Sequence, residues 1–326
     1  MTQSQPDVSI VKSNLDSIPG THRFSYEAMA TTFEVIIRSS RARYAKQAAW
    51  AAFDELTRLE GELSRFIENS DISRLNNLAA NQPLQIGLAA FECLQQSLRM
   101  YVETNGAFDI TIGSLRDCWL NDDKTMRTPS QAELALARQR SGSHLIKLNE
   151  AAHTAQLLAG QVQIDLGGIG KGYAVDRMAE LLRDWDIDTA LIHAGGSSVL
   201  AIGAPAGTAG WPLTLSSPDN HERILARLHL KDRAVSGSGL QKGRHIIDPR
   251  TAQPAGAISA AWSCASDAAT ADALSTAFMI MSADEIEQYC LSHPGTLAMV
   301  VMRQEGGDGH KDRVLRFGHW KPILSF

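Results

Sequence analysis

The sequence has few cysteines and no excess of positive charge, and these absences exclude several classes of protein. Its four cysteines, Cys93, Cys118, Cys264 and Cys290, lie far apart and form no C-x-x-C pair, which argues against a zinc knuckle, a thioredoxin-type site and a dense disulfide scaffold. Lys and Arg number 31 against 36 Asp and Glu, for a formal net charge of -5. No overall positive field therefore favours nucleic acid or anionic lipid, and we expect no nucleic-acid partner.

The chain also lacks the segments that direct a protein into or across a membrane. Its first residues, MTQSQPDVSIVKSNLD, show no basic start followed by an apolar run, and no later window holds about 18 uninterrupted apolar residues. We expect no membrane span and a cytoplasmic location, or a periplasmic one if a leader was removed. Residues 1–22 are polar and without periodicity, so we expect a flexible leader before a single domain over residues 23–326.

What the chain does have is the 44% hydrophobic content of an ordinary globular protein, arranged in regular periods. Alternation predicts a strand over Thr31–Arg38, and spacings of three and four residues predict helices over 45–63 and 88–102. The same patterns predict strands within 144–165, helices over 173–185, 266–281 and 283–291, a strand over 258–263, and a polar loop at 306–312 between two final strands. Strands and helices are mixed without strict alternation, which favours the α+β class and one large domain.

A strand, a glycine-rich loop and a helix follow one another between Gln161 and Trp185. The loop follows Asp165 and contains four glycines, Gly167, Gly168, Gly170 and Gly172. Glycines let the backbone approach a ligand closely, and the free N–H groups of a helix start attract phosphate, to which Lys171 adds a full charge. The spacing matches neither a Walker loop nor the dinucleotide fingerprint. It indicates either a phosphate site or a tight turn whose glycines serve only packing.

A second group of polar residues lies on the predicted helix over 266–281. Asp272, Ser275 and Thr276 are three and four residues apart and therefore share one face. A carboxylate with hydroxyl groups is a plausible half-shell for Mg²⁺, which prefers hard oxygen ligands. The alternative is that these residues cap the helix or face solvent.

Two loops complete the set of candidates. In GRHIIDPRTAQP, His245 can act as a general base or bind a phosphate oxygen, or can simply end a strand before an Asp-Pro turn at Asp248. In NGAFDITIG, Phe108 beside Asp109 suits an aromatic ligand, although Phe108 can equally belong to the core.

Six segments together carry a more specific signal than any single motif. They are AMATTFEV (28–35), LSRFIENSDISRLN (63–76), GAFDITIGSL (106–115), IDLGGIGKGYAVD (164–176), HIIDPRT (245–251) and ADALSTA (271–277). In this order and wording they resemble the ApbE family, the FAD:protein FMN transferases. The resemblance spans nearly the whole chain after the leader and implies a single α+β unit with a core likened to tandem T-fold elements.

The resemblance also implies a set of site residues. Those expected around FAD are Met29, Phe66, Ala107, Phe108, Asp109, Asp165, Lys171 and Ile247. Those expected around Mg²⁺ are the carbonyl group of Gly168 and the side chains of Asp272, Ser275 and Thr276. His245 and Asp272 are the expected catalytic residues, with His245 accepting the hydroxyl proton or holding the pyrophosphate.

The reaction that the resemblance implies is Mg²⁺-dependent transfer of FMN from FAD to a Ser or Thr hydroxyl of a partner flavoprotein, with release of AMP. The alternatives are an FAD pyrophosphatase, which gives FMN and AMP, and a flavin-binding protein without catalysis. The chain departs from the family pattern at His193–Ser197, where Asn-x-Gly-Gly-Asp/Asn is usual, and at Ser236–Gly239, where Ser-Gly-Asp is usual. Many members of the family are exported and lipid-anchored, but no lipobox cysteine lies near the start of this sequence.

Overall fold

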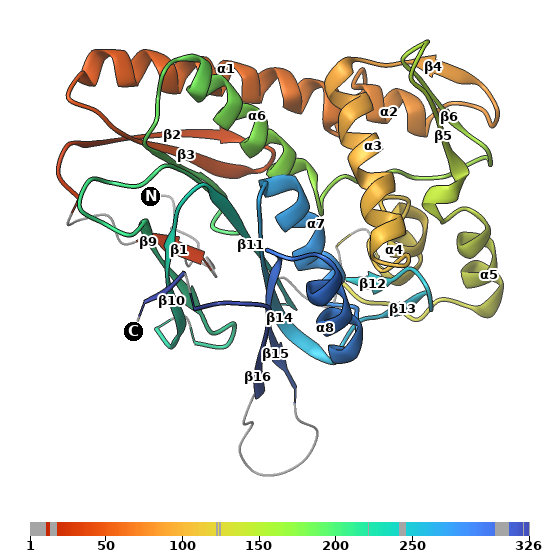
Figure 1. Ribbon diagram of the computed structural model, residues 1–326. Helices are drawn as coiled ribbons and strands as arrows, with labels where there is room; N and C mark the ends of the chain where they lie inside the picture. The colour runs from red at the N-terminus through yellow and green to blue at the C-terminus, as the bar shows by residue number, and fades with distance from the viewer. Residues whose placement is uncertain are drawn as a thin grey trace.

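One antiparallel sheet of eight strands runs through the middle of the molecule (Figure 1). Its strands, in spatial order, are β16 (Arg313–Phe317), β15 (Leu297–Met302), β14 (Ile258–Ala265), β11 (Arg233–Gly239), β8 (Ser198–Ile202), β7 (Ala190–Ala194), β3 (Thr31–Arg38) and β2 (Thr21–Ala28). The computed structural model describes residues 11–13, 18–121, 123, 125–220, 222–240, 246–303, 313–321 and 323–325. The two edge strands of this sheet, β2 and β16, come from near the two ends of the described chain.

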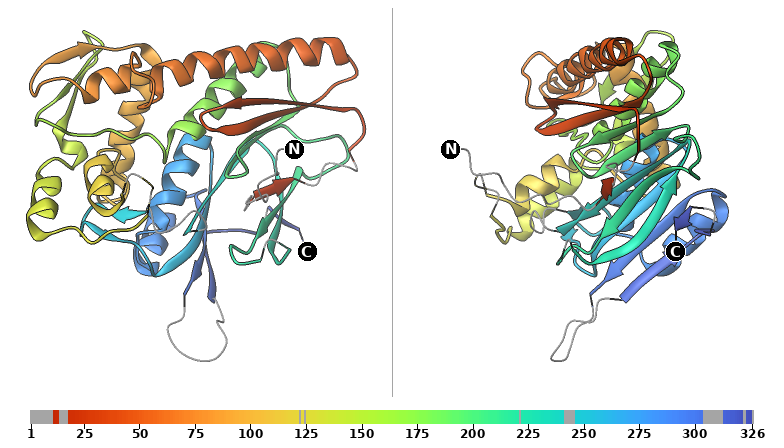
Figure 2. Two further views of the ribbon diagram at one scale, coloured as in Figure 1. Left: turned by 180° about the vertical axis from the view of Figure 1, so that it is seen from behind. Right: turned by 90° about the vertical axis from the view of Figure 1, so that its left-hand side faces the viewer.

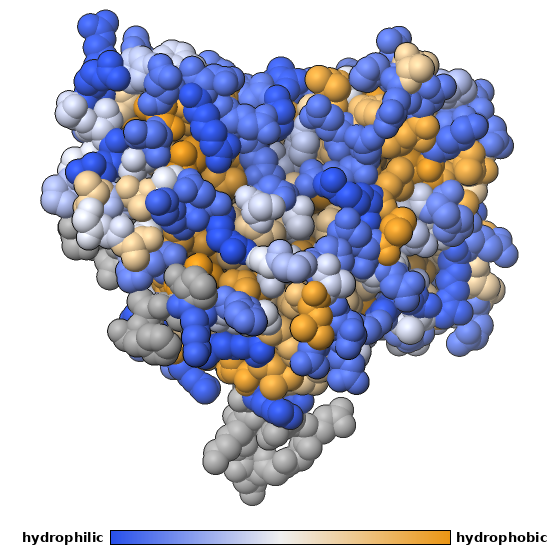
Figure 3. Space-filling model, viewed as in Figure 1, coloured by the Kyte–Doolittle hydropathy of each residue, from blue (hydrophilic) through white to orange (hydrophobic). Residues whose placement is uncertain are grey.

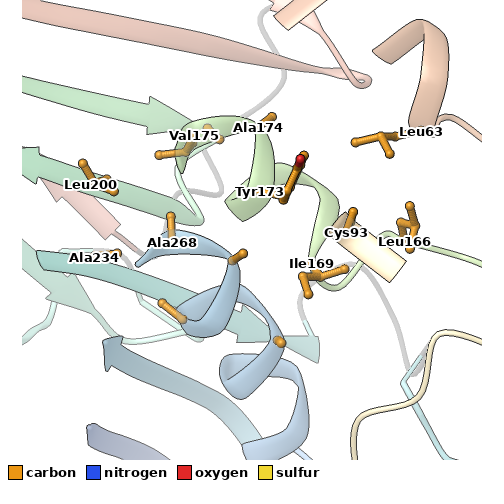
Figure 4. Packing of buried hydrophobic residues seen from close by; sticks show 14 of the residues in the cluster. Leu63, Cys93, Leu166, Ile169, Tyr173, Ala174, Val175, Leu200, Ala234 and Ala268 are labelled. Carbon is orange, nitrogen blue, oxygen red and sulfur yellow. The ribbon is translucent and has the colours of Figure 1, made fainter. Parts of the chain in front are cut away.

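Helices cover one face of this sheet and enclose the larger hydrophobic core with it. α1 (Ala42–Leu63) packs on β2 and on α6 (Gly170–Asp184), and α7 (Ala268–Phe278) packs on α6, β11 and β14. The buried stripe of α1 contains four alanines, Ala45, Ala48, Ala49 and Ala52, and such small side chains let neighbouring elements approach closely. Figure 4 shows where α6, α7 and the sheet meet, with Val175 on α6, Ala268 on the first turn of α7 and Leu200 on β8.

A smaller sheet covers part of the opposite face. It consists of β1 (Val11–Ser13), β9 (Trp211–Ser216), β10 (Ile224–Leu230) and β17 (Leu324–Ser325). A second core, which includes the fully buried Trp211 and Trp262, lies between the two sheets. β1 falls within the segment that was expected to be a flexible leader, and it pairs with β9 over three residues. That segment therefore contributes a strand to the fold, and β2 already begins at Thr21.

The remaining elements lie to one side of the large sheet (Figures 1 and 2). They are α2 (Asp71–Asn76), β4 (Pro83–Gln85), α3 (Leu88–Glu103), α4 (Gly113–Trp119), α5 (Gln131–Gln139), the 3₁₀ helix Ser143–Leu145, β5 (Ile146–Asn149), β6 (Thr154–Leu157), β12 (Ile247–Asp248) and β13 (Gln253–Pro254). α8 (Ala283–Ser292) follows α7 and packs on β15 and β16. The prediction of the α+β class is confirmed.

Most long elements match the sequence patterns. The strand Thr31–Arg38 has the predicted bounds, and the helices predicted over 45–63, 88–102 and 283–291 correspond to α1, α3 and α8. α6 begins at Gly170, three residues before the predicted start. The predicted strand at 161–165 is only an isolated parallel bridge between Gln163 and Ile112. The loop expected at 306–312 lies outside the described residues.

The surface agrees with the mixed composition. On the face shown in Figure 3, hydrophilic residues predominate and hydrophobic residues form several separate areas. No helix in the described part of the chain combines the length and the apolar character that crossing a bilayer requires.

Candidate functional site

A cavity of about 870 Å³ opens where the large sheet, the glycine loop and α7 come together. Its lining comes from segments far apart in the sequence: residues 11–13, 30–34, 107–112, 165–171, 193–197, 237–239, 246–249 and 272–280 each contribute to its walls. The volume falls within the usual range of about 300–1,000 Å³ for cavities that enclose a small molecule. The two motifs that were modest signals separately therefore share one cavity.

The glycine loop lies directly against α7. A Cβ added at Gly168 would lie 3.2 Å from the hydroxyl oxygen of Thr276 and from a ring carbon of Phe108. A Cβ added at Gly172 would overlap the carbonyl group of Ala268, the first residue of α7. The interpretation of the loop as a packing turn thus holds for Gly172, while Gly168 lines the cavity.

The side chain of Asp272, on α7, reaches the start of α6 and lies near Lys171. Its Oδ2 atom accepts a hydrogen bond of 3.1 Å from the Gly172 amide and lies 3.6 Å from Nζ of Lys171. The residue at the N-cap position of α6, Ile169, offers no side-chain acceptor. Asp272 therefore accepts a hydrogen bond from one of the first amide groups of this helix, and its carboxylate faces the positive end of the helix dipole.

Two serines hold the other oxygen of Asp272. Oδ1 accepts hydrogen bonds of 3.1 Å from Ser198 on β8 and 3.1 Å from Ser236 on β11. Only 3% of the Asp272 residue surface is exposed, so it is not a solvated residue, and the N-cap of α7 is Asp267 instead. The carboxylate is oriented by four donor groups from three elements.

A group of hydroxyls extends this arrangement along α7. Oγ of Ser238 lies 2.8 Å from Oγ of Ser275 and 3.4 Å from Oγ1 of Thr276. Ser275 is fully buried and donates to the carbonyl oxygen of Asp272, whereas Thr276 and Asp272 line the cavity. Ser238, which replaces the usual acidic residue of the family pattern, thus contacts two of the predicted metal residues.

The donors gathered here fit the chemistry that Mg²⁺ requires. Within the described ranges, no three or more His, Cys, Asp or Glu side chains form a group that could hold a metal ion. The oxygen atoms available are the carboxylate of Asp272, the hydroxyl of Thr276 and the carbonyl of Gly168. These are hard ligands of the kind that Mg²⁺ prefers, and water and phosphate oxygens usually complete its coordination.

Asp165, just before the glycine loop, lines the cavity and lies between two arginines. Its Oδ2 atom pairs with Arg116 and, at 3.2 Å, with Arg65, while Oδ1 accepts from the amide of Gly167 at 2.9 Å. Arg116 also pairs with Asp117 at 3.9 Å, so two arginines and two carboxylates lie together here. Asp165 thus shapes the glycine loop and holds Arg116 at the wall of the cavity.

The loop between α3 and α4 supplies Ala107, Phe108 and Asp109 to the cavity. Oδ1 of Asp109 accepts hydrogen bonds from the Thr111 amide, the Thr111 hydroxyl and the Ser143 hydroxyl at 2.7–2.8 Å. Burial raises the pKa of Asp109, while these hydrogen bonds act in the opposite direction. Phe108 is only 3% exposed, so it belongs to the core and also borders the cavity.

The structure brings together only part of the predicted set. Ile247, on β12, lines the cavity. Met29 lies in the tight turn between β2 and β3, with a φ of 50, and its amide donates to Glu60, but its neighbour Ala30 lines the cavity in its place. Phe66 is 83% exposed and lies outside the lining. His245 lies outside the described residues.

Several polar residues of the cavity were not predicted as site residues. Arg116 lines the cavity and directly follows the segment GAFDITIGSL, so its position was a usable signal, whereas Arg65, within LSRFIENSDISRLN, pairs with Asp165 outside the lining. Lys12 on β1 was hidden in a segment without periodicity. His193 is buried in the cavity wall, its Nε2 atom has no hydrogen-bond partner among the described residues, and burial lowers its pKa to about 4. His193 is therefore neutral at physiological pH.

The fold and the cavity together define an α+β protein with a cavity of a size that can enclose a small molecule, and comparisons with known proteins identify its family. The model of the ApbE family matches residues 29–301, and the chain belongs to this family. The FAD:protein FMN transferase of Klebsiella pneumoniae is 28% identical over 261 residues, which cover 75% of this chain and 74% of that protein. The FAD:protein FMN transferase of Salmonella typhimurium is 24% identical over 90% of this chain and 87% of that protein.

Solved structures agree with this assignment. The ApbE protein of Thermotoga maritima is 27% identical, with a TM-score of 0.79 over 92% of this chain and 98% of that one. The flavin transferase ApbE of Vibrio cholerae has the same fold, with a TM-score of 0.82 at 21% identity over 93% of this chain and 99% of that one. The resemblance found in the sequence is confirmed, as is the expected enzyme class, a transferase of the ApbE family.

Proposed function

We propose that this chain transfers the FMN part of FAD to a Ser or Thr hydroxyl of a partner flavoprotein. One observation within the structure carries the proposal: the glycine loop and the Asp272 face of α7 meet in one cavity of suitable size. Membership of the ApbE family and the names of its relatives support the same activity. FAD is the substrate in this proposal, and the acceptor is a flavoprotein subunit or domain.

The chemistry is transfer of a phosphoryl group with its flavin attached. The acceptor hydroxyl oxygen forms a bond to the phosphorus of the FMN half, the phosphoanhydride bond of FAD breaks, AMP leaves with the bridging oxygen, and the hydroxyl proton passes to a base or to water. Such reactions depend mainly on alignment and on neutralising charge at the phosphate oxygens. Lys171, in the first turn of α6, and Arg116, on α4, are two of the positive side chains that line the cavity and would serve this task.

Asp272, Thr276 and the Gly168 carbonyl group would hold Mg²⁺, with Ser275 supporting them from the buried side through Ser238. When bound, Mg²⁺ would neutralise charge on the diphosphate. The chain's own contribution is to orient Asp272 through Ser198, Ser236 and the Gly172 amide. These contacts fix the carboxylate before any ligand arrives.

His245 remains the candidate for the base that accepts the hydroxyl proton, on the strength of the HIIDPRT segment and of Ile247, two residues later, which lines the cavity. General bases contribute about 10²–10⁴-fold to a rate. A His245→Ala variant should lose transfer to that degree while it still binds FAD. Unchanged transfer with unchanged FAD affinity would remove His245 from the mechanism.

The decisive experiment is mass spectrometry of flavin-free candidate acceptor flavoproteins after incubation with this chain, FAD and Mg²⁺. Transfer predicts a covalent FMN adduct on a Ser or Thr and one AMP for each adduct. Free FMN and AMP without any adduct would identify an FAD pyrophosphatase instead. FAD binding without any AMP would identify a flavin-binding protein without catalysis. A parallel reaction in EDTA tests the requirement for a divalent cation.

A further inference from the structure

At the start of both α6 and α7, backbone amides donate hydrogen bonds to a carboxylate of the other helix. Asp272 on α7 accepts from the Gly172 amide of α6, as described above. In return, Asp176 on α6 accepts from two amides of α7, with Oδ1 2.7 Å from the amide nitrogen of Ala268 and Oδ2 2.8 Å from that of Ala269. Each helix therefore satisfies backbone donors at the start of the other.

On each helix, the amide that donates and the carboxylate that accepts lie on one face. Gly172 and Asp176 are four residues apart on α6, and Ala268 and Asp272 are four residues apart on α7, so each pair is stacked on one side. Because Gly172 has no side chain, α6 touches the Ala268 carbonyl group directly. The helices are thus fixed to one another at two points, one turn apart. The point at Asp272 faces the cavity, and the point at Asp176 faces away from it.

We propose that Asp176 is a positioning residue for the transfer reaction: its ionised carboxylate holds the first turn of α7 on α6 and thereby fixes Asp272 opposite the glycine loop. The proposal rests on the proposed function, since Asp272 is placed at the FAD diphosphate there. Asp176 itself does not line the main cavity. It acts only through α7.

A second cavity, of about 680 Å³, reaches Asp176 from the other side of the helix pair. The charged and titratable groups around Asp176 come from three elements: Tyr173, Arg177, Glu180 and Arg183 on α6, Glu92 and Arg99 on α3, and Asp267 at the start of α7. This cavity gives protons from solvent a route to a carboxylate that is otherwise enclosed. Asp176 can therefore change its charge without the protein unfolding.

Burial is the main cause that raises the pKa of Asp176 to about 7; the hydrogen bonds from the two α7 amides lower this pKa, and the nearby charges of Asp267 and Glu180 raise it. Above that pH the carboxylate is ionised and both of its hydrogen bonds are charge-assisted. Below it, the carboxyl group is neutral and holds the α7 amides less strongly. The two hydrogen bonds to α7 therefore strengthen as the pH rises through about 7, although charging this buried group lowers the overall stability of the folded protein.

The first test is the pH profile of the transfer rate at saturating FAD. In the native protein the rate should rise through about pH 7. Asp176→Asn should lose the part of this rise that Asp176 causes and should transfer at least about tenfold more slowly at high pH, because an amide group replaces one of the two acceptors and α7 is held less precisely. Glu180→Gln removes an exposed neighbouring charge and keeps Asp176, so the rise should move to lower pH. A rate and a pH profile in Asp176→Asn that match those of the native protein, or a profile that stays in place in Glu180→Gln, would overturn the proposal.

The second test needs no acceptor and no activity. Amide hydrogen exchange of the purified protein reports directly on the first turn of α7. Asp176→Asn should speed exchange at Ala268 and Ala269, whereas Asp267→Asn, which retains a side-chain acceptor at the N-cap, should leave these two amides protected. Unchanged exchange in Asp176→Asn would refute the positioning role even if transfer is found. Faster exchange in a protein that transfers no FMN would instead refute the proposed function alone.

Discussion

The starts of α6 and α7 are similar in design and different in use. Both first turns receive a carboxylate from the other helix, Asp272 for α6 and Asp176 for α7. α7 is also closed by its own cap, because Asp267 accepts from the Thr270 amide. α6 has no such cap and carries Lys171 beside the cavity instead. The start of α7 thus serves structure, whereas the start of α6, where the amides of Gly170 and Gly172 are also bonded, presents the charge of Lys171 to the cavity.

The largest expected effect comes from Asp272, the carboxylate at the start of α6. Asp272→Asn keeps the size of the side chain and removes its charge, so transfer should fall by at least about 100-fold, as it does when a pre-organised electrostatic contact is lost. Transfer rates at saturating FAD measure this. Asp284→Asn, at an exposed position in the first turn of α8, is the matched control and should leave the rate unchanged. Full transfer by Asp272→Asn would remove this carboxylate from the reaction.

Asp176, which binds the start of α7, should affect the stability of the protein as well as the transfer rate. The folded-state pKa of Asp176 is about 7 against an ordinary value of 3.8, so the folded state binds more protons between these pH values. The stability that Asp176 contributes should therefore fall as the pH rises through this window, by up to about 1.4 kcal/mol per pH unit, and level off above it.

Urea unfolding of the native protein and of Asp176→Asn at several pH values measures this contribution. The difference between the two free energies of unfolding should carry the slope. Parallel pH dependences would mean that Asp176 titrates at the same pH in the folded and unfolded states.

The contact between the two helix starts should depend on the missing side chain at Gly172. Gly172→Ala places a methyl group against the Ala268 carbonyl group and should destabilise the protein by about 1–3 kcal/mol. Thermal unfolding measures the change. Gly61→Ala is the matched control, because it is an exposed helical glycine with no atom within 4 Å of the added Cβ, and it should be neutral or slightly stabilising. Equal stability of the two variants would contradict the close helix contact.

The smallest expected effect is on FAD affinity. Lys171→Met removes a positive charge beside the first turn of α6 and should raise the dissociation constant for FAD about tenfold, or about 1.4 kcal/mol. Titration of FAD fluorescence measures it. Lys147→Met, at an exposed position on β5 outside the cavity lining, should bind FAD like the native protein. An identical affinity of both variants would place the diphosphate away from α6.

The sequence predicted the elements with clear periods and the chemistry that lies on them. Thr31–Arg38 alternates and α1 repeats every three to four residues, so local patterns were sufficient there. β1 was missed because three residues show no period, and their pairing with β9 depends on residues about 200 positions away. α4 and α5 were not predicted. Each is short, with seven and nine residues, and little of either is buried.

The sequence was sufficient to predict that the glycine loop, Lys171, Asp272 and Thr276 belong to one site, because these residues stand in recognisable segments. The partners that orient Asp272 could not be predicted in the same way. Ser198 and Ser236 are ordinary serines on separate strands, and only the order of the large sheet brings them to one carboxylate. Asp176 was within a matched segment, but its contact with α7 depends on tertiary packing.

A crystal structure with FAD and Mg²⁺ tests the account most directly. It should show the diphosphate between the glycine loop and α7, with Asp272 and Thr276 on the cation and Lys171 beside the phosphates. A diphosphate bound elsewhere, with no ligand contact to Gly168 or Asp272, would contradict the account.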